Sequence, residues 1–201
     1  MSLFDIYDNM MEIEKDYFTF ADMEKIISAK RESLYVILNR LVKKGLLQRV
    51  TKGIYKLKGK NLDIESFACS IYFPSYISFE WALAKYGTKS QIPYTLTMAT
   101  IRKTKEIRFG EVRIEYRKIR PDLLWGYDFI DKAYIAWPEK ALLDQLYLVS
   151  QKKAYLNFEE LDLKEISRRK LLSLSKSYPQ STQRLVEDLS KQFGKFKAGV
   201  R

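Results

Sequence analysis

The chain has 201 residues, of which 46% are hydrophobic and 30% charged, and its net charge is +11. This composition predicts globular domains rather than a disordered chain, and the positive charge favours an acidic partner such as nucleic acid. The absence of histidine excludes a Ser-His-Asp triad, a Cys-His pair and the usual Cys/His zinc site. No apolar run reaches the roughly 20 residues of a membrane span, and the N-terminus lacks signal-peptide features. We therefore expect a cytoplasmic protein with no membrane partner, no metal and no cofactor.

The N-terminal segment predicts three helices, at residues 3–14, 21–28 and 31–44. The third helix carries one apolar stripe with the spacing i, i+3, i+4 and i+7, made by Leu34, Ile37, Leu38 and Leu41. Gly45 follows two lysines, which is typical of a helix C-terminus.

A β-hairpin is predicted directly after the third helix. The segments 46–50 and 54–57 have strand composition, and they flank Thr51-Lys52-Gly53, where glycine permits a positive φ. A helix-turn-helix followed by a hairpin is typical of a winged helix, whose second helix can enter the major groove of DNA.

Basic side chains are concentrated on this proposed recognition helix and wing. Between residues 29 and 60 the acidic residue Glu32 stands against ten basic residues: Lys30, Arg31, Arg40, Lys43, Lys44, Arg49, Lys52, Lys56, Lys58 and Lys60. Neutralising phosphates releases counterions, so such a cluster favours nucleic-acid binding, although charge alone also fits a solvated helix face. The expected DNA-binding residues are Lys30, Arg31, Ser33, Tyr35, Asn39, Arg40, Lys43, Arg49, Lys52 and Lys56. We expect Asn39 to read adenine, Lys43 to meet phosphate, and the wing to clamp the DNA backbone.

The polar segment Gly59-Lys60-Asn61 predicts a boundary between a domain at 1–60 and a second domain at 61–201. Helices are expected at 63–72, 77–86 (with Ser78 as N-cap), 139–148, 164–176 and 180–193, and strands at 94–101, 105–109, 111–116 and 133–137. Pro138 sets the start of the helix at 139–148, and Lys140 is placed to pair with Asp144 at i, i+4. The predicted fold class is α+β: a winged helix-turn-helix, then a mixed α/β domain with an antiparallel sheet and C-terminal helices.

The predicted hairpin of the second domain carries a basic strip. Alternation of charged and apolar residues predicts one solvent-exposed sheet face there. The strip is a possible antitoxin surface or second nucleic-acid surface, and a solvated sheet face is the alternative. Its candidate residues are Arg102, Lys103, Lys105, Arg108, Arg113 and Arg117, extended by Lys118 and Arg120.

Two motifs of the second domain resemble the AbiEi family of antitoxins. One is Tyr76-Ile77-Ser78-Phe79-Glu80-Trp81-Ala82-Leu83, followed by Tyr86-Gly87 and Ile92-Pro93. The other is Ala136-Trp137-Pro138-Glu139-Lys140-Ala141-Leu142-Leu143-Asp144, which is similar to a signature of that family. A winged helix ending in Lys52-Gly53-Ile54-Tyr55 precedes them, so that the resemblance covers about residues 18–150.

The resemblance implies a repressor that binds its own promoter and acts as the antitoxin of a type IV toxin–antitoxin phage-defence system. The expected partners are double-stranded DNA, with inverted repeats in the promoter, and a nucleotidyltransferase-like toxin that is counteracted without a stable complex. Two alternatives remain open: a stand-alone winged-helix transcription factor, and a metal-dependent nuclease. The nuclease alternative depends on Glu115-Tyr116-Arg117, which ends in arginine where such a site carries lysine.

Overall fold

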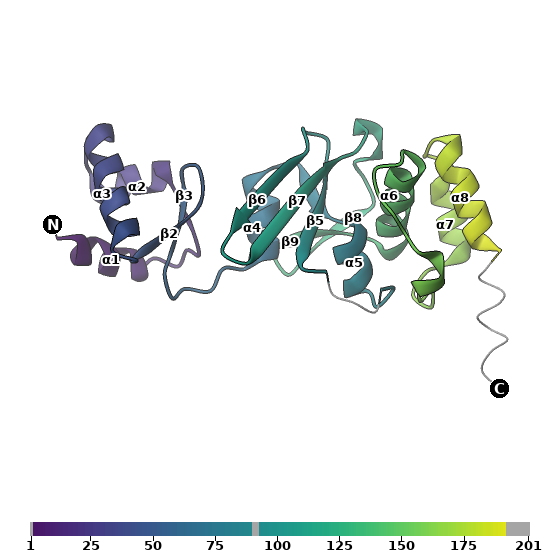
Figure 1. The fold of residues 1–201 in the computed structure, drawn as a ribbon, viewed down its shortest axis with the longest axis horizontal. Coiled ribbons are helices and arrows are strands. Elements are labelled where there is room, and N and C mark those ends of the chain that lie inside the picture. Colours follow the sequence, from purple (N-terminus) through teal and green to yellow (C-terminus); the bar gives the residue numbers. More distant parts are fainter. Residues whose placement is uncertain (1, 90–92, 192–201) are drawn as a thin grey trace. The chain divides into compact units, whose positions relative to one another are not determined.

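The computed structural model describes residues 2–89 and 93–191 (Figure 1). The chain divides into two compact units. Unit 1 consists of residues 1–64 with the short segment 107–112, and unit 2 consists of residues 65–106 and 113–201. Both helices and strands occur in the described parts of each unit, so the fold is mixed α+β.

Unit 1 combines helices with a small antiparallel sheet. Its elements in chain order are α1 (Leu3–Met11), β1 (Phe18–Thr19), α2 (Phe20–Ile27), α3 (Arg31–Lys43), β2 (Leu47–Thr51) and β3 (Ile54–Leu57). The sheet has the order β1-β3-β2, and β2 and β3 form a hairpin. Gly53 has a φ of 74° in the hairpin turn, a conformation that glycine adopts without the steric cost of a side chain.

Reciprocal hydrogen bonds define where the first two helices begin. The Ser2 hydroxyl accepts from the backbone N–H of Asp5, and the Ser2 N–H donates to the Asp5 carboxylate. Thr19 and Asp22 repeat the same arrangement at the start of α2. Each pair satisfies backbone donors that a helix N-terminus leaves free. The start of α2 is thereby fixed, and with it the turn that leads into α3.

The three helices and the hairpin of unit 1 share one apolar core. One face of α3 contributes Leu34, Leu38 and Leu41, which are all almost completely buried. They pack with side chains from the other elements: Ile6, Met10, Phe18, Met23, Ile27, Leu47, Tyr55 and Leu57. Burial of this stripe turns the opposite face of α3 to solvent.

Unit 2 is built around a larger sheet. The elements that lie wholly or partly in it are α4 (Ile64–Ile71), β4 (Ser75–Ile77), α5 (Phe79–Lys85), β5 (Thr95–Thr100), β6 (Lys105–Phe109), β7 (Val112–Lys118), η1 (Pro121–Leu123), β8 (Tyr127–Ile130), β9 (Ala133–Ala136), α6 (Pro138–Ser150), η2 (Phe158–Glu160), α7 (Arg168–Ser175) and α8 (Gln180–Ser190). Residues 64, 107–109 and 112 of α4, β6 and β7 are those that the division assigns to unit 1.

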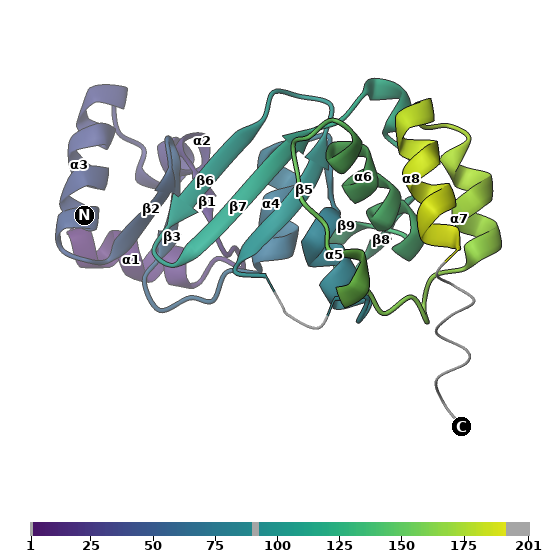
Figure 2. The same cartoon turned by 45° about the vertical axis from the view of Figure 1, so that its right-hand side comes forward.

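The described strands of unit 2 form one sheet with the order β6-β7-β5-β4-β9-β8 (Figure 2). Strands β4 and β5 are antiparallel, as are β8 and β9, whereas β5 runs parallel to β7 and β4 runs parallel to β9. The predicted antiparallel sheet was therefore wrong, because the sheet is mixed. Sequence patterns identify a hairpin through its short turn, but a parallel pair is joined by a long connection that leaves no local signal.

Helices cover both faces of this sheet, as the contacts of β7 show. Successive residues of a strand point to opposite faces. On one face Tyr116 donates a hydrogen bond of 2.8 Å to the carbonyl of Ala68 in α4. On the other face the guanidinium of Arg117 lies 5.3 Å from the ring centre of Phe79 in α5. The prediction of a solvent-exposed sheet face is wrong at Arg117, because α5 covers that end of β7.

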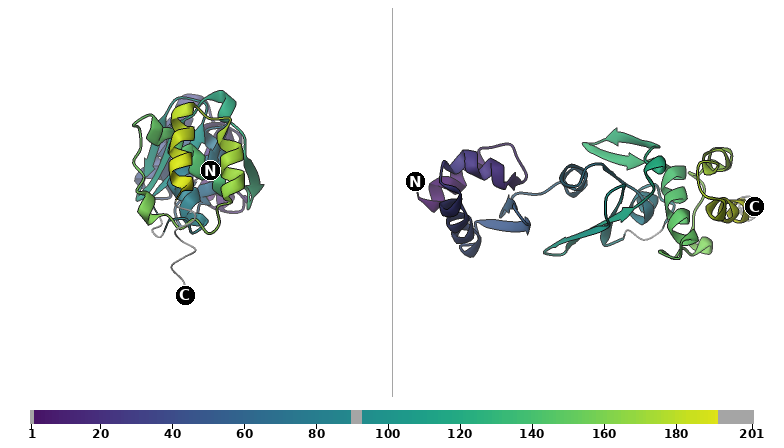
Figure 3. Two further views of the ribbon diagram at one scale, coloured as in Figure 1. Left: turned by 90° about the vertical axis from the view of Figure 1, so that its right-hand side faces the viewer. Right: turned by 90° about the horizontal axis from the view of Figure 1, so that it is seen from above.

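The C-terminal helices pack together in unit 2. Helix α6 is buried along most of its length, and it contacts α5, α7 and α8. Helices α7 and α8 lie side by side, in yellow-green and yellow in Figure 3. A helix that is buried on nearly all sides must be apolar or have its polar groups paired. Helix α6 contains Glu139, Lys140, Asp144 and Gln145 among its buried residues, so their partners matter for stability.

Most of the predicted elements are present, with shifted ends. The third helix, the N-terminal hairpin, the start of α6 at Pro138 and the strand at β9 are confirmed. Strands β1, β4 and β8 were not predicted, and Ile77 belongs to β4 rather than to the helix expected there. Helix α7 begins after Ser167, whose side chain caps it, rather than at residue 164. The predicted end of the last helix at Phe193 lies outside the described residues.

Candidate nucleic-acid interface

The outward face of α3 gathers most of the residues that were predicted to bind DNA. The side chains of Ser33, Asn39, Arg40 and Lys43 are exposed, as is Lys30 at the helix start. They lie away from the buried leucine stripe, so the core of unit 1 fixes their direction. The structure therefore brings these residues together on one surface of one helix.

The N-terminal half of α3 is organised by Phe20, the first residue of α2. The ring of Tyr35 lies 4.6 Å from the ring of Phe20, and the guanidinium of Arg31 lies 5.3 Å from the same ring centre. Ring and cation contacts of this kind restrict the rotamers of both partners. Arg31 and Tyr35 are thus pre-positioned at the helix start. The importance of Phe20 was not predicted, because an aromatic residue near a helix start is most simply interpreted as core.

An apolar residue on this face was also missed. Val36 is 49% exposed and Tyr35 is 46% exposed, so two large side chains with apolar surface stand among the polar residues of this helix. Val36 lies one helical turn before Asn39 and Arg40, at i+3 and i+4. The surface therefore combines apolar groups with a carboxamide and cations. This mixture suits the base edges of DNA, where thymine presents a methyl group.

The basic residues of the β2–β3 hairpin differ in their exposure to solvent. Arg49 and Lys52 are exposed, whereas Lys56 is partly buried and its ammonium donates to the carbonyl of Lys60 at 3.5 Å. Lys60 in turn donates to the carbonyl of Ile13 at 2.6 Å. Of the three wing residues predicted to contact DNA, Arg49 and Lys52 are the more accessible.

The basic strip of unit 2 is less uniform than its sequence suggested. Arg102 and Lys103 are exposed, as is Arg108, which belongs to the 107–112 segment of unit 1. The guanidinium of Arg102 and the ammonium of Lys105 lie 4.5 and 4.9 Å from the ring centre of Tyr72. Tyr72 was not predicted as part of the strip, because it lies some thirty residues earlier in the chain.

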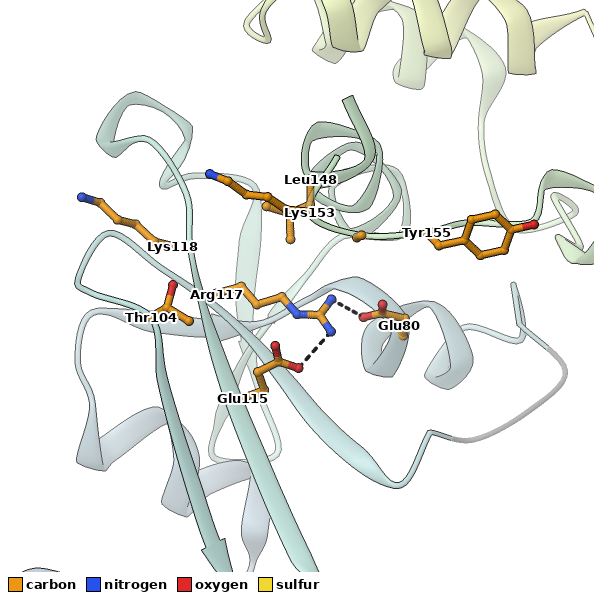
Figure 4. Close-up of a pocket in the computed structure, with 9 residues that line it drawn as sticks. Glu80, Thr104, Glu115, Arg117, Lys118, Leu148, Lys153 and Tyr155 are labelled. Atoms are coloured by element: carbon orange, nitrogen blue, oxygen red, sulfur yellow. Dashed lines mark hydrogen bonds and ion pairs between the residues drawn. The ribbon is translucent and has the colours of Figure 1, made fainter. Parts of the chain in front are cut away.

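The arginines of β7 are engaged in ion pairs. Arg113 pairs with Glu106 at 2.9 Å on the surface. Arg117 pairs with Glu80 at 2.7 Å and with Glu115 at 3.0 Å, and its side chain is only 19% exposed (Figure 4). Burial disfavours the charged guanidinium, but the bonds and charges of both carboxylates outweigh it and raise the pKa of Arg117. Arg117 is therefore a poor candidate for an open contact surface.

The segment 139–144, within the second motif that resembles the AbiEi family, forms part of the core of unit 2. The side chain of Lys140 is completely buried, and its ammonium pairs with Asp144. The ammonium therefore does not face solvent. It lies 5.1 to 5.3 Å from the ring centres of Trp125, Tyr76 and Tyr178. Burial lowers the pKa of Lys140, and the charge of Asp144 opposes this shift. The predicted pairing at i, i+4 is confirmed, but its complete burial was not predicted.

Asp144 collects hydrogen bonds from several elements. The hydroxyls of Tyr76 and Ser78 both donate to its Oδ2 at 2.8 Å, and the hydroxyl of Tyr178 donates to its Oδ1 at 2.8 Å. Ser78 stands at the predicted N-cap position of α5, yet its hydroxyl is directed to Asp144. Burial, followed by the charge of Asp144, raises the pKa of Tyr76 well above its usual value. The cluster ties β4, α6 and the segment between α7 and α8 together, so its geometry is that of a structural core.

Glu139, also buried, has a similar role at the start of the same helix. Its carboxylate accepts from the backbone N–H of Ser167 at 3.0 Å and pairs with Lys170 at 2.9 Å. Glu139 lies in the first turn of α6, where its negative charge also complements the helix dipole. Its contacts also hold the start of α7 against α6.

No model of a known protein family matches this chain, and no curated protein matches it either. The resemblance to the AbiEi family therefore stays a prediction. Function must be inferred from the side chains described above.

Two general features bear on possible chemistry. Within residues 2–89 and 93–191, cysteine and acidic side chains form no group of three or more that could hold a metal ion. In the same part of the chain, no helix is both long and apolar enough to cross a membrane.

Proposed function

We propose that unit 1 is a winged-helix DNA-binding domain, with α3 as the recognition helix and the β2–β3 hairpin as the wing. The observation that carries this proposal is the division of α3 into two faces. One face is buried through Leu34, Leu38 and Leu41, and the other presents Asn39, Arg40 and Lys43 to solvent. A helix with this division can lie in a major groove while its own domain supports it from behind.

The chemistry of the exposed face supports base reading as well as phosphate binding. The carboxamide of Asn39 can form two hydrogen bonds with adenine, and Val36 can contact a thymine methyl group. Arg40 and Lys43 can neutralise phosphates beside the groove. Arg49 and Lys52 supply cations on the hairpin, so helix and wing together can hold both the bases and the backbone.

Binding to the chain's own promoter tests this proposal. Fluorescence anisotropy with a labelled promoter fragment and with a random duplex separates specific from non-specific affinity. The double variant Arg40→Gln with Lys43→Gln is expected to bind both duplexes at least about tenfold more weakly, because each removes a phosphate contact. Lys164→Gln with Lys176→Gln removes the same charge from exposed positions of unit 2 and is the matched control.

The control variant is expected to bind DNA nearly as tightly as the unchanged protein. Equal weakening by both double variants would show that net charge, rather than the face of α3, accounts for binding. The proposal also requires that the unchanged protein bind the promoter more tightly than random DNA, because any basic protein can bind DNA non-specifically.

We further propose that the protein is a repressor and the antitoxin of a type IV toxin–antitoxin system. Support for the antitoxin role comes from the resemblance of the Ser78 and Pro138–Asp144 motifs to the AbiEi family. These motifs contribute to the core of unit 2, as a shared fold requires. The proposed partner is a nucleotidyltransferase-like toxin encoded beside this chain.

Growth rescue tests the antitoxin role separately from DNA binding. Co-expression with the neighbouring toxin gene is expected to restore growth, and the Arg40→Gln, Lys43→Gln variant is expected to rescue when expressed from an unrelated promoter. The absence of such a gene, or failure of the unchanged protein to rescue, would favour a stand-alone transcription factor.

A further inference from the structure

A pocket of about 560 Å³ lies in unit 2, where Arg117 and Lys118 of the basic strip contribute to its lining, and the proposed DNA binding by unit 1 does not require it (Figure 4). Its walls come from the end of β7, from the start of α5 and from the segment that follows α6. Leu148 and Ala154 form an apolar wall, and the remaining lining is charged or carries a hydroxyl: Glu80, Glu115, Arg117, Lys118, Lys153, Thr104 and Tyr155. A concave site of this size with a few convergent polar groups is the usual form of a small-molecule site.

The base of the pocket is a network of paired charges. Arg117 bridges Glu80 and Glu115, and the second oxygen of Glu80 accepts from the amide of Gln145 at 3.1 Å. Two carboxylates against one guanidinium leave an excess of one negative charge. Each carboxylate can accept about four hydrogen bonds, so Glu115 keeps acceptor capacity beyond its bond to Arg117.

The backbone that positions Glu80 is strained. Phe79, the residue before it, is completely buried and has a φ of 57°, which is a rare conformation for a bulky residue. Thr97 holds the turn in place: its hydroxyl donates to the carbonyl of Ser78 at 2.7 Å and accepts from the N–H of Trp81 at 3.1 Å. Strain of this kind is found most often at binding and catalytic sites, where it serves to position a side chain. Here it directs Glu80 at Arg117.

The mouth of the pocket has the opposite charge. Lys118 at the end of β7 and Lys153 after α6 are both exposed, and Figure 4 shows their side chains extending toward the same side of the pocket. Thr104, with its hydroxyl, lines the pocket on the same side. Lys153 also donates to the amide oxygen of Gln151 at 2.7 Å, which limits its motion. Two ammonium groups and a hydroxyl suit a phosphate group.

We propose that this pocket binds a small sugar phosphate, either free or as part of a nucleotide. Lys118 and Lys153 hold the phosphate at the mouth, and Glu80 and Glu115 accept hydrogen bonds from sugar hydroxyls at the base. A carboxylate is a common partner of ribose hydroxyls in nucleotide sites. The polarity of the pocket, cationic at one end and anionic at the other, requires a ligand that carries both an anion and hydroxyl donors.

Titration calorimetry of the full chain in the absence of DNA tests this assignment. The probes are ribose 5-phosphate, adenosine monophosphate and inorganic phosphate. Saturable binding of ribose 5-phosphate or of the nucleotide is expected, with inorganic phosphate at least about tenfold weaker because it makes no hydroxyl contacts. Stronger binding of one of the first two probes distinguishes the free sugar phosphate from the nucleotide.

Two variants test the two ends of the pocket. Lys118→Gln with Lys153→Gln is expected to weaken ribose 5-phosphate at least about tenfold, since two charge-assisted bonds are lost. The charge-matched control, Lys164→Gln with Lys176→Gln, is expected to bind like the unchanged protein. Glu115→Gln is expected to reduce the preference for ribose 5-phosphate over inorganic phosphate.

Several outcomes would overturn the proposal. The first is the lack of saturable binding of either sugar phosphate at millimolar concentration, and the second is equal weakening by the control variant. An unchanged preference in a folded Glu115→Gln variant would reject the role given to the carboxylates. Binding of a 5′-phosphorylated oligonucleotide without binding of either small probe would assign the pocket to a nucleic-acid terminus instead. None of these outcomes depends on whether α3 binds DNA.

Discussion

Asp144 and Tyr178 are joined by a hydrogen bond of 2.8 Å inside the core of unit 2, and Lys140 contacts both of them. The three side chains are almost completely buried. A buried charge is tolerated only when its partners are complete, so this cluster makes unit 2 sensitive to loss of any one member. Gly126 permits the arrangement, because a Cβ there would lie only 3.1 Å from the side chain of Lys140.

Asp144→Ala is expected to lower the free energy of unfolding by about 3–5 kcal/mol, because it leaves the ammonium of Lys140 buried without its counter-charge. Urea unfolding of the full chain, followed by circular dichroism, measures this change. Glu187→Ala, at an exposed position of α8, is the control and is expected to change stability by less than about 0.5 kcal/mol. A loss below about 1 kcal/mol for Asp144→Ala would contradict the importance of the buried pair.

The burial of Tyr178 predicts that the protein loses stability at alkaline pH. Burial, and then the charge of Asp144, raises the pKa of Tyr178 well above 10. The unfolded chain therefore releases this proton near pH 10 while the folded chain retains it, so stability falls as the pH rises above 10. Tyr178→Phe is expected to make this decline shallower by about 1.4 kcal/mol per pH unit. Lys140 has a lowered pKa and acts in the opposite direction below pH 10.5.

Urea unfolding at intervals between pH 9 and pH 12 measures both slopes. The comparison of Tyr178→Phe with the unchanged protein cancels the contributions of tyrosines that lie away from Tyr178, provided that the variant remains folded. Parallel slopes for the two proteins would show that Tyr178 does not keep its proton in the folded state.

The buried cluster also illustrates what the sequence could predict. The spacing of Lys140 and Asp144 predicts their pairing, since both lie on one helix. Their burial could not be predicted, because it depends on Tyr76, which lies 68 residues from Asp144 in the chain, and on Tyr178, which lies 34 residues away. Long-range contacts of this kind leave no periodic signal in a single sequence.

The same distinction applies to the candidate DNA interface. The buried and exposed faces of α3 follow from helical periodicity, so the positions of Leu34 and Asn39 were predictable. The contacts of Phe20 with Arg31 and Tyr35 were not, because they depend on how α2 and α3 pack. The pairing of Arg117 with Glu80 was missed for the same reason: strand alternation identifies a face but not the helix that covers it.

Asn39→Ala is expected to reduce the affinity for promoter DNA by about 1–3 kcal/mol and to leave non-specific affinity unchanged, because a carboxamide reads a base edge rather than a phosphate. Fluorescence anisotropy with promoter and random duplexes measures both affinities. Ser33→Ala, also at an exposed position of α3, provides a comparison on the same helix. Equal losses on both duplexes would reject Asn39 as a base reader.

Lys52→Gln is expected to lower the slope of log affinity against log salt concentration by about one unit, because one phosphate contact releases about one counterion. Lys52 is exposed in the hairpin turn, whereas Lys56 is partly buried and bonded to the carbonyl of Lys60. Lys56→Gln should therefore change the slope less than Lys52→Gln. An unchanged slope for Lys52→Gln would place the wing away from the phosphates.

Charge reversal on β7 separates the surface role of the basic strip from its structural role. Arg117→Glu would place a third carboxylate beside Glu80 and Glu115 at a site with little solvent, so it is expected to lower the unfolding free energy by several kcal/mol. Arg113→Glu removes only an exposed pair with Glu106 and should cost at most about 1 kcal/mol. Urea unfolding distinguishes the two variants before any functional assay.

Growth rescue from the neighbouring toxin is then informative for Arg113→Glu alone, since loss of rescue by Arg117→Glu is explained by its lower stability. Full rescue by folded Arg113→Glu would remove this end of the strip from the antitoxin surface, and wild-type stability of Arg117→Glu would contradict the covered ion-pair network.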